Sequence, residues 1–308
     1  MMMKNKKFTA VFILALSALV GCNGSDSPSD TPTYGDITIS VDETIKPLIE
    51  SEVTTFSSIY QYAHLKANYK AQDDAFNDLM TDSTRLIIAA RYLNRDELKQ
   101  FKSWEIVPKI TKIAIDAVAL IGSNDLKDSV ITMGDLKNLI SLGSTDKYKN
   151  TKIVFDNNNS STITTLKEKT GVGKLAPNCY ALNSSTAVLN YVEKEKNTIG
   201  VIGVNWISDN DDSTKQTFLK SVKVLGVAET DTSETFKPYQ AYIALKKYPL
   251  SRDIYVLSRE AYTGLGTGFT AFLASERGQR IVLKFGLVPA TMPVRLVELI
   301  NESYKVEN

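Results

Sequence analysis

The pattern of apolar and polar positions predicts strands and helices that alternate along most of the chain. Short apolar runs predict strands, and apolar residues spaced three and four apart predict helices. The expected strands are 37–41, 85–90, 152–155, 199–202, 222–227 and 254–257. The expected helices are 45–53, 73–80, 96–102, 134–140, 162–169, 186–195 and two or three within 268–301. This alternation predicts an α/β fold with largely parallel sheets.

One apolar run, 110–121, is longer than an ordinary strand. It is rich in Ile, Val and Ala, and strands usually have about 3 to 10 residues. We expect it to cross between two domains, with 254–257 as a second crossing strand. The length of 308 residues also exceeds one ordinary core and suits two domains.

The N-terminal end has the pattern of a processing signal. Lys4, Lys6 and Lys7 precede the apolar run 8–20, which is shorter than the roughly 20 residues that span a bilayer. The next residues, Gly-Cys22, are similar to the lipobox of bacterial lipoproteins, in which the Cys is acylated and becomes the first mature residue. The alternative is an ordinary secretory signal with a chance Cys.

Removal of residues 1–21 leaves 33 basic against 35 acidic residues. Because no basic excess remains to attract a polyphosphate, we expect no nucleic-acid partner. Residues 22–35 are rich in Ser, Asp, Pro, Gly and Thr, which predicts a flexible tether. We therefore expect a lipid-anchored protein of the bacterial cell envelope, facing the periplasm or the cell surface.

The composition lacks the residues that several classes of site require. His64 is the only histidine, and Cys22 and Cys179 are the only cysteines, so we expect neither a zinc cluster nor a Cys–His or Ser–His pair. The glycines of 264–268 lack the spacing of a dinucleotide loop. The acidic run 209–212 lacks the spaced ligands of an EF-hand loop. We expect no metal, no cofactor and no catalytic residue.

Two strand-to-helix junctions remain as candidate sites. The first carries Asp42 and Thr44, and the second carries Asp156, Ser160, Ser161 and Thr162. Free backbone N–H groups and the positive end of the helix dipole suit an anion at such a position. The same side chains are also preferred helix N-caps, and that interpretation explains either junction alone. Two junctions facing one cleft would supply donors from both sides.

Several longer stretches carry a family resemblance. They are ISVDET (39–44), IIAARYL (87–93), IAIDAVAL (113–120), SST (160–162), IGVIGVNW (199–206), YPLSR (248–252) and the segment 278–289. Together they resemble the periplasmic phosphate-binding proteins of the PstS family, most closely the lipoprotein versions from Bacteroidetes. The resemblance implies a type II periplasmic-binding-protein fold, in which two α/β lobes joined by a two-strand hinge close on a ligand.

The resemblance also implies the domain boundaries and the partners. Lobe 1 would comprise 36–115 and 255–308, and lobe 2 would comprise 116–254. The protein would be a monomer without enzymatic activity that captures inorganic phosphate, or a similar small oxyanion, for an ABC permease in the inner membrane.

The family binds phosphate with Thr and Ser hydroxyls, N–H groups of helix starts, an Arg and an Asp acceptor. By this resemblance, Thr44 matches the first hydroxyl site. Ser160 and Thr162 match the outer positions of the family's Ser-Gly-Thr, and Ser161 stands in the Gly place.

Two positions depart from the family's pattern. Asp156 stands where many members carry the clamping Arg, and Arg91 falls where some members have the Asp acceptor and others an Arg. Arg91 would either supply the missing positive charge from the other lobe or pair with Asp156 across the cleft. The expected ligand-binding residues are Asp42, Thr44, Arg91, Asp156, Ser160, Ser161 and Thr162.

Two other functions remain open on the same scaffold. One is an anion sensor or cell-surface interaction module without a role in transport. The other is a tethered hydrolase with Ser160 or Ser161 as nucleophile, although the sequence places no base beside either residue.

Overall fold

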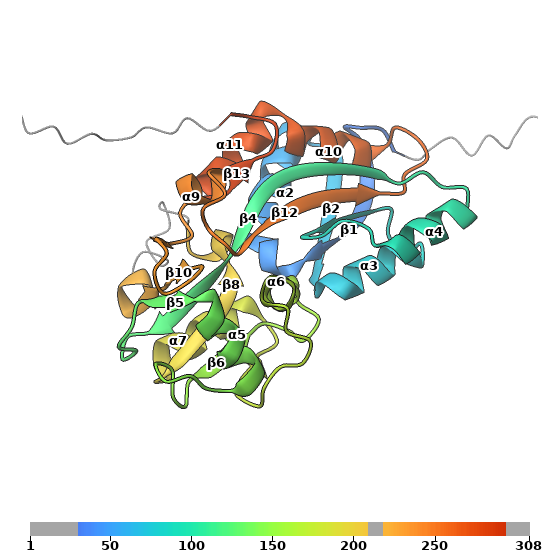
Figure 1. Cartoon of the computed structure of the whole chain (residues 1–308). Coiled ribbons are helices and arrows are strands. Elements are labelled where there is room, and N and C mark those ends of the chain that lie inside the picture. Colours follow the sequence, from blue (N-terminus) through green and yellow to red (C-terminus); the bar gives the residue numbers. More distant parts are fainter. Residues whose placement is uncertain (1–29, 209–217, 294–308) are drawn as a thin grey trace, which may run out of the picture.

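The structure is a computed structural model that describes residues 30–208 and 218–293 (Figure 1). The expected signal and Cys22, the acidic run 209–212 and the end of the last expected helix, 294–301, lie outside the described residues. One curled sheet forms the centre of the fold, with strand order β2-β1-β3-β12-β4-β8-β6-β7, and both β9 and β13 (Val288–Pro289) pair with β4. A smaller sheet has the order β11-β10-β5.

The two ends of the described chain build one part of the molecule, which we call the terminal half. Its strands are β1 (Gly35–Asp42), β2 (Ala63–Lys70), β3 (Leu86–Ala89) and β12 (Ser251–Ser258). Its helices are the 3-10 turn η1 (Glu43–Ile45), α2 (Lys46–Ile59), α3 (Gln72–Met80), α4 (Arg95–Ser103), α10 (Leu265–Ala274) and α11 (Glu276–Lys284). Its largest core forms around Phe56, whose ring centroid lies 5.3 Å from those of both Phe269 and Phe272.

The middle of the chain builds the other part, which we call the central half. Its strands are β5 (Val130–Thr132), β6 (Lys152–Phe155), β7 (Cys179–Ala181), β8 (Thr198–Gly203), β9 (Val222–Val224), β10 (Gly226–Ala228) and β11 (Thr235–Phe236). Its helices are α5 (Met133–Leu142), α6 (Ser161–Thr170), α7 (Ser185–Lys194), the 3-10 turn η2 (Val204–Trp206) and α9 (Gln240–Ala244). These elements enclose a hydrophobic core of their own.

Strand β4 (Lys109–Ser123) runs through both halves (Figure 1). Its first part pairs antiparallel with β12, from Lys109 to Ala117. Its second part pairs antiparallel with β8, from Val118 to Gly122. The long apolar run is therefore a crossing strand, as expected. The other expected crossing strand, 254–257, lies wholly beside β3 and the first part of β4, so the chain returns to the terminal half just before β12.

The sheets differ from the sequence-based expectation in three ways. The main sheet is mixed, because β12 runs antiparallel to both β3 and β4. The expected strand 222–227 is divided, because β9 pairs with β4 whereas β10 pairs with β5 and β11 in the smaller sheet. The edge strand β2 was not expected, since its sequence AHLKANYK is largely polar; His64 lies exposed on it.

The glycines of 264–268 open helix α10, as a tight helix entry. The Asp30 carboxylate accepts hydrogen bonds from Leu265 N at 2.9 Å and from Arg85 Nη2 at 2.8 Å. A side-chain carbon at Gly268 would overlap the carbonyl of Pro32. The described end of the expected tether therefore packs against the folded body, because these glycines let it approach the helix closely.

Within 30–208 and 218–293, no helix combines the length and the apolar character that crossing a membrane requires.

Candidate functional site

The first junction, residues 42–44, follows β1 and is called the terminal junction. The Asp42 carboxylate accepts a hydrogen bond from Thr44 N at 3.1 Å and so caps the turn η1. The expectation that Thr44 caps the following helix is therefore wrong, because α2 begins after this extra turn and has no side-chain cap. The hydroxyl of Thr44 is fully buried and is directed to the other half.

The second junction, residues 156–162, follows β6 and is called the central junction. Ser160 caps α6, since its Oγ accepts a hydrogen bond from Thr162 N at 3.2 Å. The Ser160 and Thr162 hydroxyls lie 2.9 Å apart, and Thr162 Oγ1 donates to Asp156 Oδ1 at 3.1 Å. Most of the polar groups at this junction are therefore satisfied locally.

The two junctions meet between the halves of the molecule. Thr44 Oγ1 lies 2.9 Å from Ser161 Oγ, within hydrogen-bonding distance. The Thr44 carbonyl accepts hydrogen bonds from Asn205 Nδ2 at 2.9 Å and from Trp206 Nε1 at 2.8 Å. A side-chain carbon at Gly203 would come within 2.8 Å of the same carbonyl, so a glycine is required for this close approach.

Arg252 joins the two junctions, and the sequence-based site omitted it. Its Nη1 donates to Ser161 Oγ at 2.7 Å, and its Nη2 donates to Thr44 Oγ1 at 3.0 Å. Its Nε and Nη2 also donate to Asp116 Oδ2, at 2.9 and 2.8 Å. Arg252 on β12 lies directly opposite Asp116 on β4. The register of the two strands therefore places the guanidinium within hydrogen-bonding distance of the Thr44 and Ser161 hydroxyls. A charged residue inside each apolar strand was the sequence signal for this pair.

Arg91 does not join the other expected site residues. Its Nη1 and Nη2 donate to the Glu97 carboxylate at 2.9 and 2.8 Å, and its guanidinium carbon lies 3.3 Å from the centroid of the Phe76 ring. Among the described residues, none of its hydrogen bonds reaches Asp156 or either junction. Glu97 also closes the capping box of α4 with Asn94. The start of α4 therefore holds the Arg91 side chain, which was expected in the cleft.

Acidic groups outnumber basic groups where the junctions meet. Burial raises the pKa of Asp42 to about 6, against the attraction of Arg252. Burial also raises the pKa of Asp156. Three deeply buried oxygens lack a hydrogen-bond partner among the described residues: Asp42 Oδ2, Asp116 Oδ1 and Asn205 Oδ1. Because a buried acceptor without a donor is costly, this environment favours a ligand that brings hydrogen-bond donors as well as acceptors.

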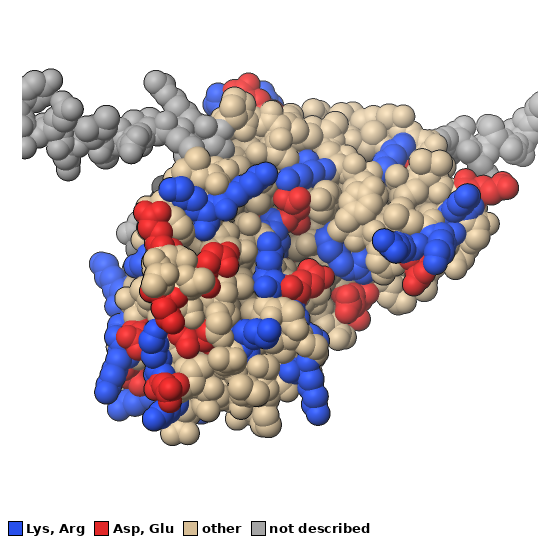
Figure 2. Space-filling view, in the orientation of Figure 1, with Lys and Arg blue, Asp and Glu red and all other residues tan. Residues whose placement is uncertain are grey.

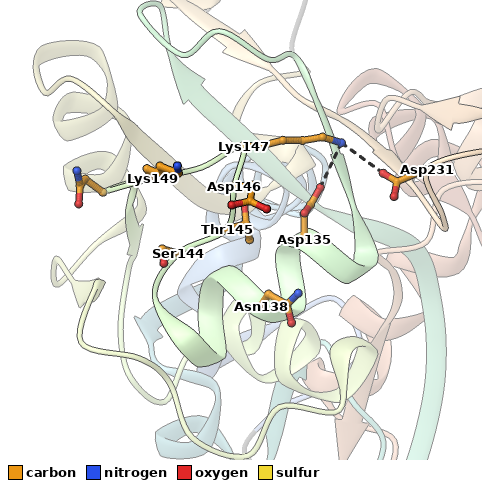
Figure 3. A pocket seen from close by; sticks show the side chains of 9 residues that line it. Asp135, Asn138, Ser144, Thr145, Asp146, Lys147, Lys149 and Asp231 are labelled. Atoms are coloured by element: carbon orange, nitrogen blue, oxygen red, sulfur yellow. Dashed lines mark hydrogen bonds and ion pairs between the residues drawn. The ribbon is translucent and has the colours of Figure 1, made fainter.

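A hollow with a volume of about 660 Å³ lies elsewhere on the central half (Figure 3). Lys147 Nζ lies 3.6 Å from Asp135 Oδ2 and 3.3 Å from Asp231 Oδ1 within it. The charges that line it therefore compensate one another. Basic and acidic side chains are likewise interspersed over the face shown in Figure 2. Neither the hollow nor this face has an excess of acidic groups like the one where the two junctions meet.

Comparisons with known proteins agree with this architecture. The PBP superfamily domain matches residues 26–277. The phosphate-binding protein PstS of Borreliella burgdorferi is 24% identical over 302 residues, covering 92% of this chain and 98% of that protein.

Two solved structures share the fold. A putative phosphate ABC transporter substrate-binding protein with bound phosphate, from Clostridium perfringens, has a TM-score of 0.68 at 22% identity, covering 83% of this chain and 99% of that one. An ABC-type phosphate transport receptor from Vibrio cholerae has a TM-score of 0.61 at 18% identity, covering 83% and 100%. The expected periplasmic-binding-protein fold is thereby confirmed. The chain belongs to the PBP superfamily and, within it, is similar to the PstS phosphate-binding proteins.

Proposed function

We propose that this protein is a lipid-anchored solute-binding protein that captures inorganic phosphate, or a similar small oxyanion, in the cleft between the halves for an ABC importer. The observation that carries the proposal is the position of Arg252, whose guanidinium donates to a hydroxyl from each half. The similarity to PstS proteins supports phosphate as the ligand. Cys22, if acylated, would hold the protein at the membrane.

Binding would proceed by hydrogen bonds from both junctions. Arg252 donates to both Thr44 Oγ1 and Ser161 Oγ, so once the hydrogen bond between these two hydroxyls breaks, each has a proton to donate to a ligand oxygen. The two oxygens lie 2.9 Å apart, which leaves no space for an atom between them. An oxyanion that reaches both hydroxyls therefore enters as the halves separate and is held as they close.

The halves would move as the proposed lobes, 36–115 with 255–308 and 116–254. The chain passes between them in β4 and in the segment just before β12, where Val118 N donates to Leu250 O at 2.9 Å. A small change in backbone angles at two adjacent crossings is the ordinary mechanism of hinge closure.

The acidic groups would select among oxyanions. Asp42 Oδ2 is buried without a hydrogen-bond partner among the described residues, and Asp42 lies two residues before Thr44. A phosphate that carries a proton can donate to such an oxygen, whereas sulfate at neutral pH cannot. We therefore expect phosphate to be preferred, with Asp42 as the acceptor.

Asp156 in the family's Arg position makes the cleft less positive than the resemblance alone would imply. Repulsion from this carboxylate weakens the binding of any anion. This observation favours the second candidate, an anion sensor or cell-surface module on the same scaffold that needs no tight capture. Co-purification with the permease of an ABC importer separates the two functions.

Equilibrium binding of labelled phosphate to the mature chain tests the proposal. We expect saturable binding, weaker binding of sulfate, and a loss of affinity of about 10- to 100-fold in Thr44→Val, the effect of one hydrogen bond to a charged partner. Thr54→Val is the matched control, since Thr54 is an exposed hydroxyl on α2 and its loss leaves the affinity unchanged.

Folded protein without saturable binding up to millimolar phosphate would overturn the proposal. Equal affinities of Thr44→Val and the parent would also contradict it. The anchor is tested separately, because Cys22→Ser should release the protein from the membrane fraction.

A further inference from the structure

Glu43 connects the two halves at a point beside the proposed ligand site. It belongs to the turn η1 of the terminal half, yet its Oε1 accepts a hydrogen bond from Ser185 N at 3.2 Å and its Oε2 accepts one from Ser185 Oγ at 2.9 Å. Ser185 is the first residue of α7 in the central half. A carboxylate is favoured at such a helix start by the free N–H groups and the dipole, so this contact draws the halves together.

The surroundings of Glu43 oppose its negative charge. Burial, then the neighbouring carboxylate of Asp156 and finally that of Asp42 raise the pKa of Glu43 to about 7, against the hydrogen bonds from Ser185. Asp156 lies in the central half, so its repulsion of Glu43 acts across the cleft. Arg252 is the cation that faces both aspartates, and its charge is shared with Asp116.

We propose that Glu43 is a positioning residue that holds the two halves together, and that closure of the cleft is coupled to uptake of a proton by this side chain. The coupling deepens the proposed function, since closure is the step that captures the ligand. When the halves separate, Glu43 leaves both Asp156 and Ser185 and becomes hydrated. Its pKa then returns toward the ordinary value of 4.5.

The direction of the pH effect follows from the difference between the pKa of Glu43 in the closed form and its pKa in the open form. Between the two pKa values the closed form keeps a proton that the open form has released, so lower pH favours closure. One proton changes the ratio of closed to open molecules by up to about tenfold per pH unit in that range. Above pH 7 both forms are ionised, and the proton no longer favours closure.

Trp206 provides a reporter of closure that needs no added ligand. Its indole N–H donates to the Thr44 carbonyl of the other half, and its side chain is buried. The sequence has two tryptophans, and the other, Trp104, lies partly exposed after α4. The variant Trp104→Phe therefore leaves one emitting indole, whose emission shifts to the red when the halves separate.

The experiment records this emission from pH 5.5 to 8.5 without phosphate, in the Trp104→Phe background. We expect the emission to shift to the red as the pH rises from 5.5 to 7 and to change little above pH 7, where both forms are ionised. Glu43→Gln keeps an acceptor for Ser185 N but cannot ionise, so we expect it to lose the part of the shift that lies between pH 6 and 7. Glu43→Ala loses the contact, so we expect red-shifted emission at every pH.

Two controls calibrate the response. Gly203→Ala places a carbon against the Thr44 carbonyl and should give the emission of the separated halves at all pH values. Glu50→Gln removes an exposed carboxylate of α2 and should retain the parent profile. Far-UV circular dichroism confirms that each variant is folded.

The proposal is overturned if Glu43→Gln retains the parent profile between pH 6 and 7, or if Glu43→Ala keeps the buried emission at pH 6. Phosphate titration of the same variants is a separate measurement. A pH-dependent Trp206 signal in a protein that binds no phosphate would refute the proposed function and leave the role of Glu43 standing.

Discussion

The terminal junction and the central junction both carry Asp, Ser or Thr between a strand and a helix, yet they are constructed differently. The central junction is a complete N-cap, in which Ser160 caps the ten-residue helix α6. At the terminal junction a single turn, η1, separates β1 from α2, which begins without a side-chain cap. Asp42 caps η1, whereas the side chains of Thr44 and Glu43 contact the other half.

The two junctions share a sequence motif, but this difference gives them different roles. Substitutions at the terminal junction should affect the contact between the halves. At the central junction Ser161 also makes that contact, whereas substitutions of Ser160 and Thr162 should affect the stability of α6. Five substitutions at or near the junctions test this division, and the largest expected effect is at Arg252, which contacts both junctions.

Arg252→Met should lower the free energy of unfolding by about 3–5 kcal/mol, because it leaves the buried Asp116 carboxylate without its partner. Urea denaturation at pH 7 measures the change. The double variant Arg252→Met, Asp116→Leu removes both charges and should recover most of the loss. A cost below about 1 kcal/mol for the single variant would show that Arg252 does not support the junctions.

Glu52→Gln should stabilise the helix that follows the terminal junction. Both carboxylate oxygens of Glu52 are buried without a hydrogen-bond partner in the described part of the chain, and burial raises its pKa to about 9. The folded protein thus keeps a proton that the unfolded chain releases above its ordinary pKa, so stability falls as the pH rises from about 4.5 to 9.

The gain from Glu52→Gln should reach about 3 kcal/mol at pH 7 and be small at pH 4.5, where the unfolded chain is also largely protonated. Thermal melts at both pH values measure it. The same gain at both pH values would mean that Glu52 ionises normally in the folded protein.

Thr44→Val and Thr162→Val are a matched pair, one at each junction. Thr44→Val should cost about 1–3 kcal/mol, because Arg252 Nη2 and Ser161 Oγ each lose a buried partner. It should also shift the emission of Trp206 to the red. Thr162→Val loses its hydrogen bond to Asp156 and should leave that emission unchanged. Equal emission shifts in the two variants would remove the distinction between the junctions.

Ser160→Ala should have the smallest effect, a loss of about 1 kcal/mol from the cap of α6. Ser184→Ala at the start of α7 is the corresponding control, since Ser184 Oγ accepts from Ala187 N at 3.1 Å. Similar losses in the two variants, measured in urea, would show that Ser160 acts as an ordinary cap. A much larger loss at Ser160 would assign it a role between the halves.

The sequence predicted those elements whose signal is local. The run 110–121 was recognised as a crossing strand because its twelve mainly apolar residues exceed the length of an ordinary strand. Strand β2 was missed because an edge strand buries few side chains and its residues are mostly polar. The division of 222–227 between two sheets depends on partners distant in the sequence, which periodicity does not report.

The same limit applies to the site. The hydroxyls of both junctions were found because capping residues mark helix starts. Arg252 was missed because its place depends on the register of β12 against β4. Arg91 lies apart from the other expected residues, because Glu97, six residues further along, binds its guanidinium, and alignment with a family motif carries no information about that contact.

Strand β4 has a consequence for how the molecule unfolds. The same backbone segment completes the sheet of one core and, a few residues later, the sheet of the other. Unfolding of either core would leave an unpaired strand edge on the core that remains folded. Such an edge is unfavourable because its backbone N–H and C=O groups lose their partners. The two cores should therefore melt in one cooperative transition, with calorimetric and van't Hoff enthalpies in agreement.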